Sequence, residues 1–169
     1  MRLDALDLQL LTLLRDHPRV GDLELSRLAG VARGTVTSRL AKMCDSGVIS
    51  GFEPQIDIAA AGFAVHAFVS LQIAQGRLDD VRRGLEAIPA VIEAYATTGD
   101  HDVMCKVAAT SHEGLQGALL AVDTVDGVRR SNSIIVLSDV VPRRLLPLLN
   151  ATDPAPSTRA RPPLTTTAS

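Results

Sequence analysis

The segment Leu23–Ile49 constrains the fold more than any other part of the chain. It contains two short helical patterns that meet at Gly30, a residue suited to a tight turn. The second pattern places Val36, Leu40 and Met43 on one face and leaves cations and small polar groups on the other. This is the layout of a helix-turn-helix, whose second helix enters the major groove of DNA. The segment therefore predicts a DNA-binding protein.

The surrounding sequence predicts a compact three-helix domain. Pro18 ends the first helix, and Asp22 is the expected N-cap of the second, with Leu25 and Leu28 facing inward. Gly47 is the expected C-terminal stop of the third helix. We expect these helices over residues 3–16, 22–29 and 33–46.

The outer face of the third helix is the candidate DNA-contact surface. Its hydroxyl side chains have groups that hydrogen-bond to base edges, and its cations reach phosphates or a guanine edge. Glycine weakens a helix by about 1 kcal/mol relative to alanine but permits close approach to DNA. The alternative is an ordinary solvated helix face. The predicted DNA-contact residues are Arg33, Gly34, Thr35, Thr37, Ser38 and Lys42.

Charge supports this placement of the surface. The net charge is −2, yet the stretch from Arg33 to Lys42 contains three cations and no acid. Positive charge is therefore concentrated where phosphates would be contacted. The third cation, Arg39, lies toward the domain interior, and we expect it to pair with Asp4 or Asp7 of the first helix.

Composition limits the other possibilities. The chain is 46% hydrophobic but only 2% aromatic, so its cores are expected to be aliphatic. It has no stretch of 18 apolar residues, so we expect no membrane partner. Cys44 and Cys105 fit no disulfide framework or metal spacing, and Cys105 alternates with core positions. We expect a cytoplasmic protein with reduced thiols.

The second half changes from a helical period to alternation. Residues 48–62 are expected to form a strand followed by a linker, since two glycines and a proline mark a boundary. The order beyond it is β-α-β-β-α-β, a ferredoxin-like unit, which gives an α+β fold class overall. Ser111 is the expected N-cap of its second helix. The expected strands cover 65–73, 91–98, 103–109 and 128–137. The expected domains are 1–50 (winged helix-turn-helix), 51–62 (strand and hinge), 63–150 (ferredoxin-like, effector-binding and oligomerisation) and 151–169 (a disordered tail).

A ferredoxin-like unit covers only one face of its sheet with helices. The bare face is expected to hold Phe68, Tyr95 and Met104. An exposed apolar patch of this kind is typical of a partner surface, so the pattern predicts a homodimer that pairs two sheets face to face. A dimer also suits a DNA-binding protein that contacts two half-sites.

The turn between the second and third strands is dense in polar groups. It contains Gly99, Asp100, His101 and Asp102. Gly-Asp is ordinary hairpin chemistry, which is the structural interpretation. The functional interpretation is a small-molecule site, in which carboxylates hold the ammonium group of an amino acid and backbone N–H groups meet its carboxylate. Adjacent strand residues diverge, so a metal site is not expected.

Catalytic motifs are missing from the sequence. It has no nucleophile elbow, no phosphate-binding loop and no dinucleotide glycine fingerprint. We therefore expect neither an enzyme nor a bound cofactor.

Taken in order, these motifs resemble those of the Lrp/AsnC (leucine-responsive, feast/famine) family of transcriptional regulators. The resemblance covers roughly residues 3–137. It implies a winged helix-turn-helix followed by a ligand-sensing domain, dimers that assemble into octamers, and an amino acid or related metabolite bound near Gly99–Asp102. The matching stretches are Leu3-Asp4-Ala5-Leu6-Asp7, Gly30-Val31, Thr35-Val36, Arg39, Gly47-Val48-Ile49-Ser50-Gly51-Phe52, Ile88-Pro89-Ala90-Val91, Thr98-Gly99-Asp100-His101-Asp102 and Gly127-Val128.

The chain departs from the family pattern at both candidate sites. Ala32 stands where the family usually has a serine cap, and an alanine there costs about 1 kcal/mol. Gly34 is unusual in the third helix, and His101 occupies a position where an aromatic residue is common. Ser131-Asn132-Ser133 replaces frequent threonines. Operator sequence and effector identity therefore do not carry over from the family.

Together these observations predict a sequence-specific transcriptional regulator that responds to an amino acid or related metabolite. Its expected partners are double-stranded DNA, the effector and further copies of the chain. Two alternatives stay open: a DNA-architectural protein without an effector, and a regulatory subunit of a metabolic enzyme. Ferredoxin-like sheets host many functions, which keeps the second alternative in view.

Overall fold

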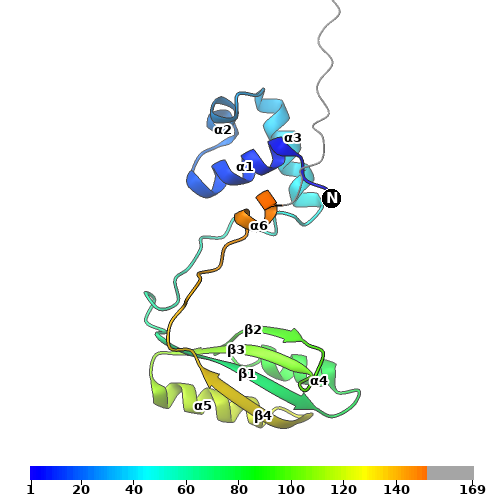
Figure 1. Cartoon of the computed structure of the whole chain (residues 1–169), viewed down its shortest axis with the longest axis vertical. Helices are drawn as coiled ribbons and strands as arrows, with labels where there is room; N and C mark the ends of the chain where they lie inside the picture. The colour runs from blue at the N-terminus through cyan, green and yellow to red at the C-terminus, as the bar shows by residue number, and fades with distance from the viewer. Residues whose placement is uncertain (152–169) are drawn as a thin grey trace, which may run out of the picture. The chain divides into compact units, whose positions relative to one another are not determined.

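The computed structural model describes residues 1–151 and divides into two compact units (Figure 1). Among the described residues, the first unit contains Met1–Glu53 together with residues 142–151, and the second contains Pro54–Val141. The predicted tail at 151–169 lies, from residue 152, outside the described residues.

The first unit is built on helix α1 (Ala5–Asp16). Its N-cap, Asp4, accepts a hydrogen bond from the backbone N–H of Asp7, and the Asp7 carboxylate accepts one from the N–H of Asp4. This reciprocal capping box satisfies two N–H groups that a helix start leaves without partners. It also explains why the helix begins two residues later than the expected Leu3.

Helices α2 (Asp22–Ala29) and α3 (Arg33–Asp45) complete the helix-turn-helix. Gly30 ends α2 with a φ of 67°, a left-handed conformation that favours glycine. The N-cap of α2 is Gly21 rather than the expected Asp22, which lies inside the helix. Leu28, expected to face inward, is 41% exposed. The fully buried core consists of Leu10, Leu25, Val36 and Met43.

The second unit contains the predicted ferredoxin-like arrangement. Its sheet is antiparallel with the order β2-β3-β1-β4 (Figure 1). The helices α4 and α5 pack on one face of this sheet, over a core of aliphatic side chains. The elements are β1 (Val65–Ile73), α4 (Leu78–Glu86), β2 (Val91–Ala96), β3 (Val103–Ala109), α5 (His112–Asp123) and β4 (Val128–Ile135).

Alternation along the strands produces the aliphatic core as expected. Val69 and Leu71 of β1 are buried beneath the helices, and Ser111 caps α5 by accepting from the N–H of Gly114. Cys105 is also buried there, and burial raises the pKa of its thiol to about 11. Leu78, at the start of α4, is 46% exposed and is not part of this core.

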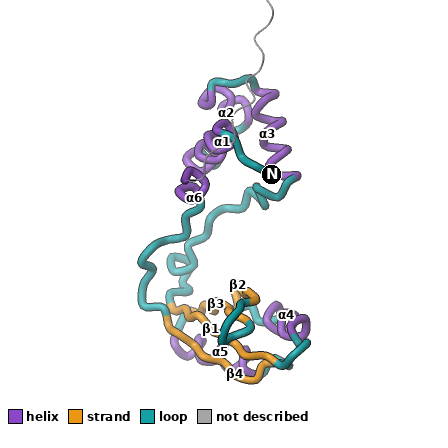
Figure 2. Tube along the Cα trace, turned by 45° about the vertical axis from the view of Figure 1, so that its right-hand side comes forward, coloured by secondary structure: helices purple, strands orange, loops and turns teal. Residues whose placement is uncertain are grey.

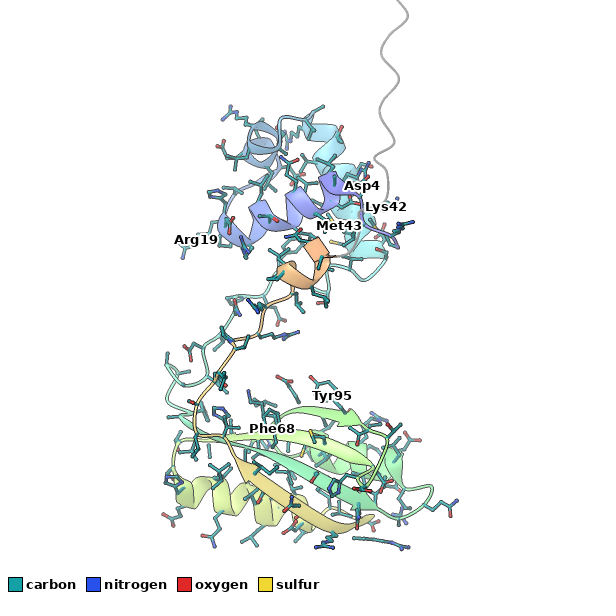
Figure 3. All side chains as sticks on the ribbon, in the orientation of Figure 1. Asp4, Arg19, Lys42, Met43, Phe68 and Tyr95 are labelled. Atoms are coloured by element: carbon teal, nitrogen blue, oxygen red, sulfur yellow. The ribbon has the colours of Figure 1, made fainter. Side chains whose placement is uncertain are left out.

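No helix or strand of the second unit covers the opposite face of the sheet, which is called the open face below. Phe68, Tyr95 and Met104 are exposed there by 41%, 58% and 37%. Phe68 lies beside Lys106 of β3 and Ile134 of β4, and the Lys106 ammonium is 5.9 Å from the centre of the Phe68 ring. Figure 3 labels Phe68 and Tyr95 on this face.

Two segments differ from expectation. Residues 46–64, all within the described part, contain no strand, so the strand expected within residues 48–62 is not found. The short helix α6 (Leu146–Ala151), expected in the second domain, belongs instead to the first unit. It lies beside α1, as Figure 2 shows. The boundary of the second unit therefore falls at Val141 rather than at residue 150.

Candidate nucleic-acid interface and effector site

The predicted DNA-contact residues lie together on the outer face of α3. Val36 and Met43 are fully buried and Leu40 packs partly buried against the same core, so the side of α3 away from these positions turns outward. Lys42 and Met43 are labelled in Figure 3. All six predicted residues are exposed: Arg33, Gly34, Thr35, Thr37, Ser38 and Lys42.

The cations on this face are free to meet phosphates. Within residues 1–151, the side chains of Arg33 and Lys42 have no ion-pair or hydrogen-bond partner. Arg27, by contrast, pairs with Glu24 at 3.1 Å on α2. A free cation loses no existing partner when it contacts a phosphate, so Arg33 and Lys42 are the two cations of this face suited to such a contact.

Arg39 takes the structural role that the sequence predicts. Its guanidinium donates to the Asp4 carboxylate at 2.5 Å and to the Asp7 carboxylate at 3.1 Å. These contacts join α3 to the capping box of α1. The Arg39 and Asp4 side chains are only 24% and 11% exposed. Arg39 therefore fixes α3 on α1.

The ion pair shifts the pKa of both partners. Burial is the largest influence on Asp4 and by itself raises the pKa of the carboxyl. The hydrogen bonds from the Asp7 N–H and Arg39 together outweigh burial, so the pKa lies below its usual 3.8. The hydrogen bond to Asp4 is the main cause that raises the pKa of Arg39. Both side chains are therefore charged at neutral pH.

Thr37 has a contact that the sequence did not predict. Its hydroxyl lies 2.5 Å from the Asp22 carboxylate, at the start of α2, and 3.2 Å from the backbone carbonyl of Arg33. The pair is 15 positions apart, and no periodic pattern relates the two residues. The side chains of Thr35 and Ser38 have no hydrogen bond within residues 1–151.

The helix start beside this face has no side-chain cap. Ala32 is the N-cap of α3, and its methyl group accepts no hydrogen bond. Gly34 is exposed in the next turn, and a Cβ there would contact nothing within 4 Å. Space within the chain therefore does not require glycine at this position.

The predicted effector residues form one turn between β2 and β3. Gly99 has a φ of 105°, which favours glycine. The Asp102 carboxylate accepts from the backbone N–H of Ile73 at 2.8 Å, and the Gln72 amide donates to the Asp100 carbonyl at 3.0 Å. The turn is thus fastened to the end of β1.

The polar groups of this turn are not equivalent. One Asp102 oxygen is occupied by the Ile73 N–H. The Asp100 carboxylate is exposed and has no partner within the described residues. The Nδ1 atom of His101 is buried and has no hydrogen bond there. Residues 1–151 contain no group of three or more His, Cys, Asp or Glu side chains placed to hold a metal ion.

An apolar cavity beside the turn was not predicted. It has a volume of about 420 Å³ and lies between α4 and β2. Ala96 and Val103, which flank the turn on either side, both line it. Its apolar wall includes Leu85 and Ala94. Its charged lining consists of Arg82, which pairs with Glu86 at 2.9 Å, and of the acids Asp79 and Glu93. The signal in the sequence was the small side chains of Ala94 and Ala96 at helix-facing positions of an edge strand.

Comparison with known proteins matches each half of the chain to a described family. Residues 3–50 match the family described as winged helix-turn-helix DNA-binding. Residues 66–146 match the family described as the Lrp/AsnC ligand binding domain. No helix within residues 1–151 has both the length and the apolar character needed to cross a membrane.

Individual relatives agree with these matches. The HTH-type transcriptional regulator FL11 of Pyrococcus horikoshii is 31% identical over 135 residues, which cover 80% of this chain and 89% of that protein. The structure of AsnC from E. coli has a TM-score of 0.80 and 28% identity, covering 87% and 100%. The leucine response regulatory protein LrpA of Mycobacterium tuberculosis has a TM-score of 0.73 and 29% identity, covering 86% and 100%.

Proposed function

The chain belongs to the Lrp/AsnC family of transcriptional regulators, and from this premise we propose that it binds specific DNA sequences in response to an amino acid or related metabolite. The observation that carries the DNA-binding part is the outer face of α3. Within the described residues, this face carries two cations without a partner and two hydroxyl side chains without a hydrogen bond: Arg33, Lys42, Thr35 and Ser38. Arg39 holds the helix against α1 through Asp4. This combination provides phosphate contacts and base contacts on one surface.

The effector site is proposed at the turn formed by Gly99, Asp100, His101 and Asp102. The unpaired Asp100 carboxylate suits the ammonium group of an amino acid. The neighbouring cavity suits an apolar side chain, since small-molecule sites are mostly apolar with a few polar groups. The relative named for a leucine response makes leucine the first compound to test.

Homodimerisation is proposed through the open face of the sheet. Phe68, Tyr95 and Met104 would leave water on pairing, and burial of such side chains drives association. The face also carries Lys106 and Glu93. Because a two-fold dimer pairs the same surface of two copies, a cation of one copy could meet an acid of the other. Dimers would present two copies of α3 to two half-sites, and we propose that they assemble further into octamers.

The test is a two-part binding experiment on the full chain. Bound fragments are first selected from genomic DNA, and their affinity is then measured with and without each of the common amino acids. The proposal expects selection of a shared sequence and a changed affinity with at least one amino acid, because an effector must bind two states differently. If a shared DNA sequence is selected but no amino acid changes the affinity, the result supports a DNA-architectural protein. If the chain binds no DNA, the proposed function is wrong.

A further inference from the structure

The contact between Thr37 and Asp22 determines what Thr37 is able to recognise. We propose that Thr37 acts only as a hydrogen-bond acceptor toward DNA, because Asp22 retains its hydroxyl proton. Its target would be the exocyclic amino group of adenine or cytosine in the major groove. This inference rests on the proposed function, in which the outer face of α3 enters that groove.

The first step concerns the single proton of the hydroxyl group. A threonine hydroxyl has one O–H donor and two acceptor lone pairs. The Thr37 oxygen lies 2.5 Å from the Asp22 carboxylate and 3.2 Å from the Arg33 carbonyl. Both neighbours are acceptors without a proton to give. Whichever of these two acceptors Thr37 donates to, its only O–H group is directed at the protein and is not available to a base.

The second step concerns which neighbour holds the proton. Hydrogen bonds from a hydroxyl to an ionised carboxylate are short, about 2.5–2.7 Å. The separation from Asp22 falls in this range, whereas the contact to Arg33 is longer. Asp22 is therefore the principal acceptor. The lone pairs of Thr37 remain available on an exposed side chain.

The third step connects this arrangement to the bases. In the major groove, adenine and cytosine present amino donors, while guanine O6 and thymine O4 are acceptors. A hydroxyl without an available proton can accept from the amino groups of adenine and cytosine. It cannot donate to guanine O6 or thymine O4, so it disfavours these two bases. Thr35 and Ser38 have no such restriction within the described residues, so they are able to donate or accept. Thr37 would thus be the residue of this face that separates amino bases from keto bases.

The experiment removes the amino group from DNA rather than only changing the protein. A duplex is first selected from a random pool with the full-length wild-type chain. Each adenine of the selected half-site is then replaced in turn by purine, and each cytosine by 2-pyrimidinone, which lack the amino group. Dissociation constants are measured for wild type and for Thr37→Val, with thermal unfolding as the check on folding.

We expect one replacement to weaken wild-type binding about fivefold more than it weakens Thr37→Val binding, the effect of one lost hydrogen bond. Asp22→Ala should keep this difference but weaken the discrimination against guanine or thymine at the same position, because the hydroxyl loses its principal acceptor and is then able to donate to a keto oxygen. Thr35→Val is the control for loss of a hydroxyl from the same face and should keep the wild-type sensitivity. Glu24→Ala is the control for loss of an acid from the first turn of α2 and should also keep it.

The remaining outcomes separate the two hypotheses. If the wild-type chain binds a selected duplex but every replacement affects wild type and Thr37→Val equally, Thr37 is no amino-group reader and the inference is wrong. The inference is also wrong if removal of the amino group still weakens binding of Thr37→Val but no longer weakens binding of Asp22→Ala. In that case Asp22 itself would contact the base. If the wild-type chain selects no duplex, the proposed function fails together with the inference.

Discussion

The guanidinium of Arg39 lies 2.5 Å from the carboxylate of Asp4, the residue that caps helix α1. The same guanidinium contacts Asp7, the other member of the capping box. One cation thus joins the start of α1 to the middle of α3. The outward positions Thr35, Ser38 and Lys42 take no part in this contact and stay exposed.

Arg39→Met should destabilise the helix-turn-helix without removing any group from its outer face. The change leaves Asp4 and the 1% exposed side chain of Asp7 without a cation. We expect a loss of about 2 kcal/mol in the free energy of unfolding, the scale for hydrogen bonds to charged groups. Chemical denaturation followed by circular dichroism measures it. Arg15→Met removes only the exposed pair with Asp16 and should cost less than about 0.5 kcal/mol, so equal losses would contradict the structure.

Acid should weaken the same unit through Asp4. Its folded-state pKa lies below the usual 3.8, so its stabilising contribution is fully present above that value. The contribution is lost as the pH falls through the lower folded-state pKa. The difference in unfolding free energy between wild type and Asp4→Asn should therefore be constant near neutral pH and shrink in strong acid. High salt screens the exposed Arg15–Asp16 pair during this measurement. A difference that grows on acidification would contradict the shift.

The Asp4–Arg39 contact was predictable because Arg39 lies beside the inner face of α3 and Asp4 lies at the start of the first helix. Once Val36 and Met43 define the inner face of α3, Arg39 must flank it, and the acids of α1 are the charges within reach. Alternation likewise placed Val69 and Leu71 in the core. Regular patterns carry this information because each residue's direction follows from its position in the element.

The features that were not predicted depend on contacts that no local pattern describes. Asp22 was expected to cap α2, but its carboxylate accepts from Thr37 across the turn. The cavity beside Ala94 depends on how α4 is spaced from the edge strand β2. Helix α6 was placed in the wrong unit because its packing on α1 is long-range in sequence.

Lys42→Ala should weaken DNA binding for every sequence by a similar factor. Lys42 is exposed and has no partner within residues 1–151, so it would contact a phosphate directly. Loss of one phosphate contact should reduce the slope of log affinity against log salt by about one. Fluorescence anisotropy over a range of salt concentrations measures it. Arg27→Ala, which removes a cation already paired with Glu24, is the control and should change the slope less.

Two substitutions of Asp102 should distinguish its hydrogen bond to Ile73, which stabilises the turn, from its proposed role in binding the effector. Asp102→Asn keeps a carbonyl acceptor for the Ile73 N–H but removes the negative charge. Asp102→Ala removes both and should lower the stability of the second unit by about 1 kcal/mol. Calorimetry should show weaker amino-acid binding in both variants, with normal thermal unfolding only in Asp102→Asn. Normal binding in both would remove Asp102 from the effector site.

Phe68→Asp should convert the proposed dimer into a monomer. The Phe68 ring is 41% exposed on the open face and is neighboured by Lys106 and Ile134. A two-fold interface would bury the exposed part of the ring in both copies. Full burial of a large apolar side chain contributes about 1.5–3 kcal/mol, and less than half of each ring is left to bury, so the dimer dissociation constant should rise about 10- to 50-fold. Light scattering after size-exclusion chromatography measures the mass. Leu120→Asp tests an apolar side chain that is 58% exposed on α5, on the helical face, and should leave the mass unchanged. The face-to-face interface is wrong if Phe68→Asp keeps the wild-type mass while Leu120→Asp loses it.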